Sequence, residues 1–233
     1  MKKSIPMIIQ RIGLAMLILS FALLGVNFAL ASATSQFSQT INAGTLATDI
    51  RDASRVTIAN PSVGFSAKTF SFDCQSGGSA STATFGSSSV RLYVDNPGAA
   101  NNGWTLAIAA SSTTATWANA SSTQRMDFND PTSSGCTDSA DAGDTVGGQM
   151  TIDANAGTVT ADYTGGNTTG ISKGASASFN EGSVDSITLL TGAAGSDDIG
   201  RWYLSGVNMS QTIPAQQVND SYSINLTLTV TAS

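Results

Sequence analysis

The sequence contains no histidine and only one glutamate, Glu181, and 11% of its residues are charged. Without histidine, the chain cannot form a Ser-His-Asp triad or the usual zinc sites. Its glycines do not have the spacing of a phosphate-binding loop or of a dinucleotide fingerprint. Aspartate pairs like those of glycosidases are available, but no motif indicates where one would lie. We therefore predict that the protein is not an enzyme.

Basic residues are also few, and three of the ten lie at the start of the chain. Lys2, Lys3 and Arg11 precede the apolar residues 12–30, which end in small side chains. This order predicts a secretory signal peptide over residues 1–33, removed by cleavage. A retained membrane anchor is the alternative, because the apolar run is long enough to span a bilayer. The small residues favour cleavage, so we expect no stable membrane insertion of the secreted protein.

Loss of the leader would leave seven basic residues against sixteen acidic ones, which changes the formal net charge from −6 to −9. Nucleic acids are bound through Lys and Arg at their phosphates, so this charge argues against a nucleic-acid partner. It also opposes docking on anionic lipid. The chain is rich in serine, threonine and alanine and has 23 glycines, a composition typical of bacterial proteins outside the cell. We expect a location at the cell surface or cell wall.

Only two cysteines are present, Cys74 and Cys136. Export leads to an oxidising compartment, and an even number of cysteines suits a disulfide. Such a bridge would close a long loop and contribute about 4 kcal/mol by restricting the unfolded chain. Two free thiols are the alternative. We predict the bridge, because an exposed thiol outside the cell is easily oxidised.

Beyond the leader, apolar and polar residues alternate with a period of two, which is typical of half-buried strands. The clearest example is the segment 222–230, in which apolar residues alternate with serine, asparagine and threonine. The same alternation occurs in residues 90–94, 104–108 and 159–163. Turn residues such as Asn, Asp, Pro and Gly separate these segments. We predict an all-β fold, a single sandwich or barrel-like domain of mainly antiparallel strands.

The alternation changes parity twice, across Gly206 and within residues 63–72, which predicts a bulge or bend at each place. No linker divides the chain after the leader. We therefore expect one domain over residues 55–233, preceded by an N-terminal strand segment at 34–54. The apolar residues at alternate positions are numerous enough for one core of this size.

Two short segments resemble the motifs of WxL-domain surface proteins. Residues 90–111 lead from a strand through an Asp- and Gly-containing turn to Gly103-Trp104-Thr105-Leu106, as in the first motif. The end of the chain is similar to the second motif, with Leu228 and Val230 where the family has tryptophan and leucine. The resemblance extends over residues 55–233. It implies a secreted bacterial protein held non-covalently to the cell wall through peptidoglycan.

The resemblance makes Trp104, Leu106 and Trp202 candidates for glycan binding. Trp202 begins a second Trp-x-Leu triplet, Trp202-Tyr203-Leu204. An indole at the margin of a sheet could stack on a sugar while polar neighbours bond to its hydroxyls. The alternative is a core position, because residues two apart on a strand point to the same face. Both interpretations remain open from the sequence.

An acidic loop over residues 127–144 contains five of the sixteen acidic residues of the chain. Six side chains in it could supply oxygen ligands to calcium: Asp127, Asn129, Asp130, Asp138, Asp141 and Asp144. Calcium takes six to eight oxygen ligands, and clustered carboxylates repel one another without a cation. The alternative is an exposed loop whose Asp and Asn side chains form turns with their own backbone. Calcium is the only cofactor that we expect.

We predict a wall-associated protein that binds peptidoglycan or another wall glycan. The alternative is a structural subunit that assembles with itself into a surface layer or fibre. In that case the extended segment 37–50 would complete a neighbouring sheet by strand addition, with residues 226–230 as the receiving edge. Pairing of both segments within their own domain is the simpler outcome.

Overall fold

The computed structural model describes residues 38–98, 102–138, 145–195 and 199–233. The chain divides into two units, Met1–Ile41 and Asn42–Ser233, and the second holds all of the strands reported below. The expected signal peptide, residues 1–33, lies outside the described residues. Within the described ranges, no helix has the length and apolar character needed to cross a membrane.

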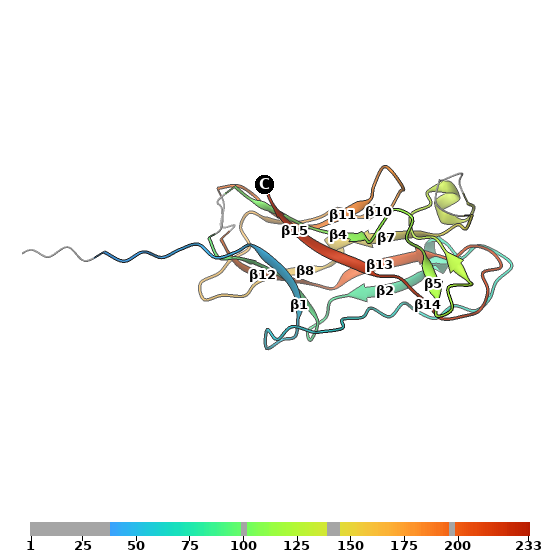
Figure 1. Ribbon diagram of the computed structural model, residues 1–233, viewed down its shortest axis with the longest axis horizontal. Coiled ribbons are helices and arrows are strands. Elements are labelled where there is room, and N and C mark those ends of the chain that lie inside the picture. Colours follow the sequence, from blue (N-terminus) through green and yellow to red (C-terminus); the bar gives the residue numbers. More distant parts are fainter. Residues whose placement is uncertain (1–37, 99–101, 139–144, 196–198) are drawn as a thin grey trace, which may run out of the picture. The chain divides into compact units, whose positions relative to one another are not determined.

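The described chain consists of short strands joined by loops and 3-10 turns (Figure 1). The strands are β1 (Ala47–Arg51), β2 (Ser81–Phe85), β3 (Arg91–Asn96), β4 (Trp104–Ala110), β5 (Trp117–Asn119), β6 (Arg125–Met126), β7 (Gln149–Asp153), β8 (Thr158–Ala161), β9 (Ile171–Lys173), β10 (Ala177–Ser178), β11 (Ser186–Gly192), β12 (Gly200–Ser205), β13 (Val207–Thr212), β14 (Tyr222–Ser223) and β15 (Leu226–Ala232). The 3-10 turns are η1 (Gly77–Ser79), η2 (Thr132–Gly135) and η3 (Ala154–Ala156). The predicted all-β class is confirmed.

The strands form four antiparallel sheets with the orders β1-β3-β12-β8, β10-β7-β13-β2, β15-β4-β11-β9 and β14-β5-β6. The first two sheets are joined along the chain, because β12 leads directly into β13 and β7 leads through η3 into β8. They therefore form the two halves of one layer. The sheet β15-β4-β11-β9 forms the opposite layer, so the domain is sandwich-like (Figure 1).

The bend predicted at Gly206 lies where the two halves of the first layer meet. Strand β12 ends at Ser205, and Gly206 has a φ of 77°, a left-handed conformation that favours glycine. The Gly206 amide donates to the carbonyl oxygen of Gly86 at 3.1 Å. A Cβ atom on Gly86 would lie 2.9 Å from the Ser205 Cα atom. The close approach of these two backbones therefore requires glycine at position 86.

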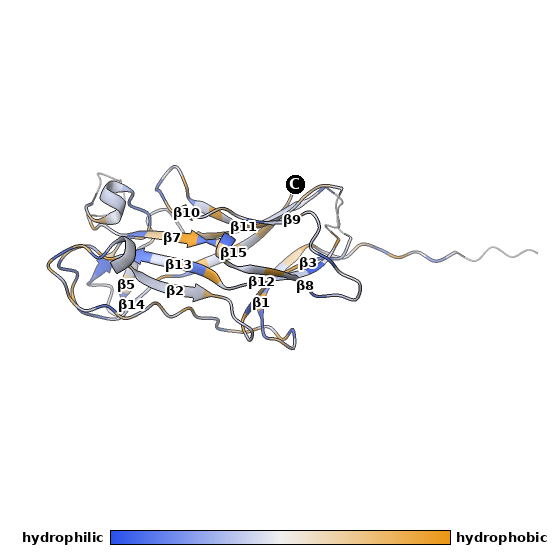
Figure 2. Cartoon of the chain, turned by 180° about the vertical axis from the view of Figure 1, so that it is seen from behind, coloured by the Kyte–Doolittle hydropathy of each residue, from blue (hydrophilic) through white to orange (hydrophobic). Residues whose placement is uncertain are grey.

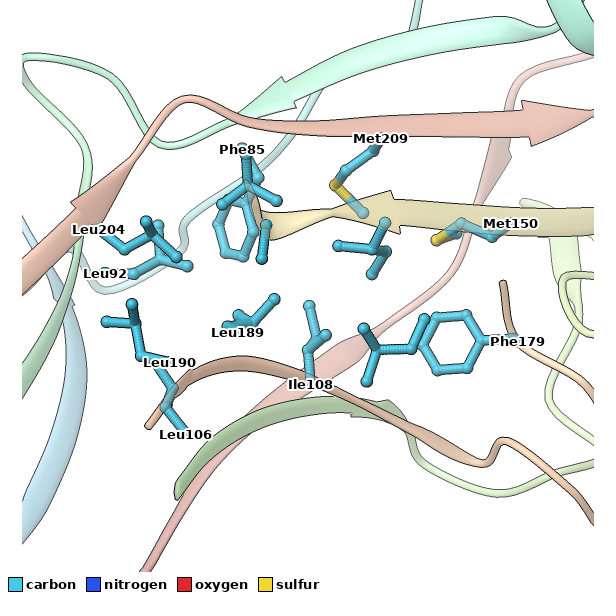
Figure 3. Packing of buried hydrophobic residues seen from close by; sticks show 14 of the residues in the cluster. Phe85, Leu92, Leu106, Ile108, Met150, Phe179, Leu189, Leu190, Leu204 and Met209 are labelled. Carbon is cyan, nitrogen blue, oxygen red and sulfur yellow. The ribbon is translucent and has the colours of Figure 1, made fainter. Parts of the chain in front are cut away.

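The core lies between the two layers, where alternate residues of each strand point inward (Figure 3). In β4, for example, Trp104, Leu106 and Ile108 are buried and the residues between them are partly exposed. Hydrophobic and hydrophilic residues likewise alternate along β7 and β13 in Figure 2. Full burial of each large apolar side chain contributes about 1.5–3 kcal/mol. The period-two pattern of the sequence thus corresponds to one continuous core.

The segment 222–230, predicted as one strand, is two strands. Strand β14 pairs with β5, and β15 pairs with β4 in another sheet. The chain leaves one sheet and joins the other at Ile224 and Asn225, so regular pairing stops there. Upstream, the last part of the segment 37–50 belongs to β1, which pairs with β3 of the same chain.

Paired charges lie around the sheet β1-β3-β12-β8. Arg55 donates two hydrogen bonds to the carboxylate of Asp162, at 2.8 and 2.9 Å. Arg51 and Arg201 both form ion pairs with Asp95. The hydrogen bonds from Arg55 lower the pKa of Asp162 below its ordinary value of 3.8. The folded state therefore favours the ionised form of this carboxyl group.

The variant Asp162→Asn is expected to show a small, pH-dependent loss of stability. Because the pKa of Asp162 is lowered in the folded protein, its stabilising contribution is complete above the unfolded pKa of about 3.9. The contribution disappears as the pH falls through the folded value. Urea unfolding of wild type and variant at pH 7, 5 and 3 measures this, and a difference that grows toward pH 3 would contradict it.

Candidate functional site

The three candidates for glycan binding lie in the core. Trp104 is 1% exposed, and Leu106 and Trp202 are fully buried. The Trp104 and Trp202 rings contact each other with centroids 5.7 Å apart. The Trp202 indole N–H donates to the carbonyl oxygen of Asn167 at 2.8 Å. In this structure the three side chains therefore belong to the core and are not exposed to a ligand.

The acidic loop is divided between buried and exposed residues. Asp127, Asn129 and Asp130 are buried, whereas Asp138 is exposed. Asp130 accepts a hydrogen bond from the Thr132 amide at 2.8 Å, as in the turn interpretation. Among the described residues, no group of three His, Cys, Asp or Glu side chains is arranged to hold a metal ion.

Two of the six predicted calcium ligands, Asp141 and Asp144, lie outside the described residues. Calcium binding by the complete loop therefore stays a prediction.

The predicted disulfide between Cys74 and Cys136 is present. It attaches the segment that leads into η1 to the acidic loop. The next residue, Gln75, exchanges two backbone hydrogen bonds with Ile213, at 2.9 and 3.1 Å. This backbone pair holds residues 65–75 against residues 213–222, together with a hydrogen bond from the Gln216 amide to the Ser71 oxygen at 2.8 Å. The bridge fixes the end of the same segment to the acidic loop.

These two segments enclose a pocket of about 320 Å³, which we call the aromatic–amide pocket. It is lined by aromatic rings, side-chain amides, one carboxylate and one ammonium group. The main contributors are Phe65, Phe70, Trp117, Tyr222, Gln75, Gln211, Gln217, Asp220 and Lys68. A few polar groups placed among apolar walls are characteristic of small-molecule sites.

The floor of the aromatic–amide pocket is fixed by a buried hydrogen-bond network. The Trp117 indole N–H donates to the side-chain oxygen of Gln211 at 2.8 Å. The Gln211 amide group donates in turn to the backbone oxygens of Asp127 and Thr212, at 2.9 and 2.8 Å. The Phe65 ring meets the Trp117 ring edge to face, with centroids 5.3 Å apart. These contacts give the floor a defined shape before any ligand binds.

The polar wall of the aromatic–amide pocket is also ordered. The Gln217 amide group donates to the Tyr222 hydroxyl at 2.8 Å, and this hydroxyl donates to the Val218 backbone oxygen at 2.6 Å. Asn119 donates to the Asp220 carboxylate at 2.8 Å and lowers the pKa of this carboxyl group. Asp220 is therefore ionised at neutral pH. The wall presents an ordered amide, a phenol and a negative charge.

The rim of the aromatic–amide pocket is apolar and exposed. Phe70 lines the pocket and is 46% exposed, and Phe72 stands next to it at 76% exposed. Their rings meet edge to face with centroids 5.2 Å apart. Lys68 lies on the same segment and also lines the pocket. Exposed aromatic side chains beside polar groups are characteristic of recognition surfaces.

No motif in the sequence indicates the aromatic–amide pocket. The residues 63–72 show a strand-like alternation but form no strand. A hydrogen bond from the Ser66 amide to the Thr82 oxygen, at 2.7 Å, connects them to β2. Phe70 and Phe72 of the rim were the only sequence signal for this pocket, because the opposite wall, residues 213–222, lies far away in the sequence. Comparisons with protein-family models, with curated proteins and with solved structures found no match to the chain.

Proposed function

We propose that the protein is a secreted, non-catalytic surface protein that attaches to the cell wall by binding glycan in the aromatic–amide pocket. The observation that carries the proposal is the combination of Phe70, Tyr222 and ordered side-chain amides in one pocket. Sugars present C–H faces that pack on aromatic rings, and hydroxyl groups that bond to amides and carboxylates. The N-acetyl groups of peptidoglycan sugars add amide donors and acceptors.

The volume of the pocket supports a short glycan segment as the ligand. About 320 Å³ is at the lower end of the range for small-molecule sites. The overall charge favours neutral sugars over phosphate-bearing wall polymers, because a chain of net charge −9 after loss of the leader repels polyanions. The resemblance of residues 90–111 to the WxL motif and the expected signal peptide agree with this location.

Binding without hydrolysis is supported by the acidic groups of the pocket. Glycosidases use two carboxyl groups on either side of the scissile bond. Asp220 is the only carboxylate among the described residues that line the aromatic–amide pocket. One carboxylate can bond to sugar hydroxyls but cannot supply both the acid and the base. The arrangement therefore suits attachment.

The variant Phe70→Ala is expected to weaken binding to purified peptidoglycan sacculi by roughly tenfold, about 1.4 kcal/mol. The ring is exposed and lines the pocket, so its removal deletes a contact surface without opening the core. Co-sedimentation of the protein with sacculi over a range of concentrations measures the change.

Phe72→Ala is the matched control, because Phe72 belongs to the same segment and is more exposed but does not line the pocket. Equal binding by both variants and wild type would reject the aromatic–amide pocket as the site. Absence of binding by the wild type would reject the proposed function. Repeating the sedimentation with calcium and with a chelator also shows whether the acidic loop contributes.

A further inference from the structure

A second cavity opens on the flank of the sandwich, between β15 and the irregular segment 57–65. This flank slot has a volume of about 620 Å³. Ile50, Val63, Leu226 and Leu228 line its sides, and all four are only partly buried. The slot reaches the buried core residue Ile108. Partly buried apolar side chains that pack against the core thus line one side of the domain.

Strand β15 borders the flank slot, and no strand of the described residues pairs with its edge opposite β4. It pairs with β4 on one side and is the longest of the edge strands in the described sheets. Natural edge strands are usually protected by charges, proline, bulges or covering segments. Strand β1 carries Asp49 and Arg51, β9 carries Lys173, and β2 is covered by Ser66. The sequence of β15, Leu-Thr-Leu-Thr-Val-Thr-Ala, contains none of these protections.

The backbone of β15 is oriented to receive another strand. The Ser233 amide donates to the Gly103 oxygen at 3.1 Å, which identifies these opposite residues as a hydrogen-bonded pair. Such pairs alternate along an antiparallel ladder. The backbone N–H and C=O groups of Leu226, Leu228 and Val230 therefore point to the free edge. A strand added there would place alternate side chains in the flank slot.

The segment that precedes β1 has the properties of such a strand. Residues 38–46 have no regular secondary structure, and Ile41 is 87% exposed. No charged residue occurs from position 34 to position 48, and none occurs in β15. Pairing of these two segments therefore brings no charged side chains of the segments themselves together. Phe37 and Ile41 are four residues apart, so an extended strand would place both on one face.

We propose that residues 34–42 of one copy add as a strand to the free edge of β15 in a second copy, with Ile41 in the flank slot. This interaction goes beyond glycan binding and uses a different cavity. The donor segment cannot extend far past residue 42, because the Gly44 amide donates to the Pro97 oxygen at 3.1 Å within its own chain. Each copy offers one donor and one acceptor, so the contact is head-to-tail and can propagate into chains.

The donor is tested by sedimentation velocity of the chain from residue 34 over a range of concentrations. We expect concentration-dependent assembly of the wild type, and Ile41→Asp should weaken it at least tenfold. Thr40→Asp is the matched control, because it adds the same charge on the opposite face of the extended segment. Monomeric wild type at all concentrations, or equal assembly by the wild type and Ile41→Asp, would overturn the proposal.

The acceptor is tested with Thr227→Lys, which places a charge on the edge of β15 at an exposed side chain. We expect the same loss of assembly, whereas Thr158→Lys on the edge strand β8 should assemble normally. A synthetic peptide of residues 34–46 should bind to the chain and dissociate the assemblies. A peptide that does not bind, or that binds Thr227→Lys as well as wild type, would contradict strand addition at this edge. Phe70→Ala should leave assembly unchanged, so the test is independent of glycan binding.

Discussion

Replacement of Trp202 by alanine is expected to lower the free energy of unfolding by about 3–5 kcal/mol. The side chain is fully buried, and its ring contacts Trp104 at a centroid distance of 5.7 Å. Its indole N–H also donates to the Asn167 carbonyl oxygen. Truncation would leave a large cavity in the core and remove the donor of this carbonyl group. Equilibrium urea unfolding followed by circular dichroism measures the loss.

Tyr163→Ala is a suitable comparison, because Tyr163 meets the edge of the Trp202 ring but is 36% exposed. We expect it to cost clearly less. A double-mutant cycle with Trp104→Ala should show coupling, because the two indoles contact each other and their truncation would open one common cavity. If Trp202→Ala unfolds at the same urea concentration as wild type, the indole is not part of the core.

Removal of the disulfide by the double substitution Cys74→Ala and Cys136→Ala is expected to cost about 4 kcal/mol. The bridge joins residues that are 62 positions apart, so its loss releases a large loop in the unfolded chain. The same bridge fixes the end of residues 65–75, the segment that forms one wall of the aromatic–amide pocket, to the acidic loop. We therefore expect weaker binding to sacculi as well as lower stability, with urea unfolding and co-sedimentation as the measurements.

Treatment of the wild type with a thiol reductant should reproduce both effects, whereas reductant should not change the double variant. A stability loss below about 1 kcal/mol would mean that the unfolded chain gains little freedom when the bridge is absent. Normal binding by the double variant would mean that the Gln75 and Ile213 backbone pair is sufficient to form the pocket wall.

The class of fold was predictable because each strand carries its own signal. The alternation at Trp104, Leu106 and Ile108 reports burial directly, and the change of parity at Gly206 reports the bend between β12 and β13. The boundary between β14 and β15 was not predictable. Alternation continues through Ile224 and Asn225, and only pairing with different partner strands interrupts the ladder.

The aromatic–amide pocket was not predictable for a related reason. Its walls come from segments more than one hundred residues apart, and Trp117 on its floor belongs to a third segment. Alternation also cannot distinguish a tryptophan in the core from one at a margin, so Trp104 and Trp202 were candidates for a surface role. Burial of a ring depends on what covers it, and that information is non-local.

The covalent link between Cys74 and Cys136 has a consequence for the timing of biogenesis. A closed loop of this size would obstruct threading of an unfolded polypeptide through a translocation channel. Reducing conditions in the cytoplasm keep the two thiols reduced until the chain has crossed the membrane. On the proposed export route, oxidation therefore fixes residues 65–75, one wall of the aromatic–amide pocket, to the acidic loop only after translocation. The aromatic–amide pocket would therefore gain this constraint only outside the cytoplasm.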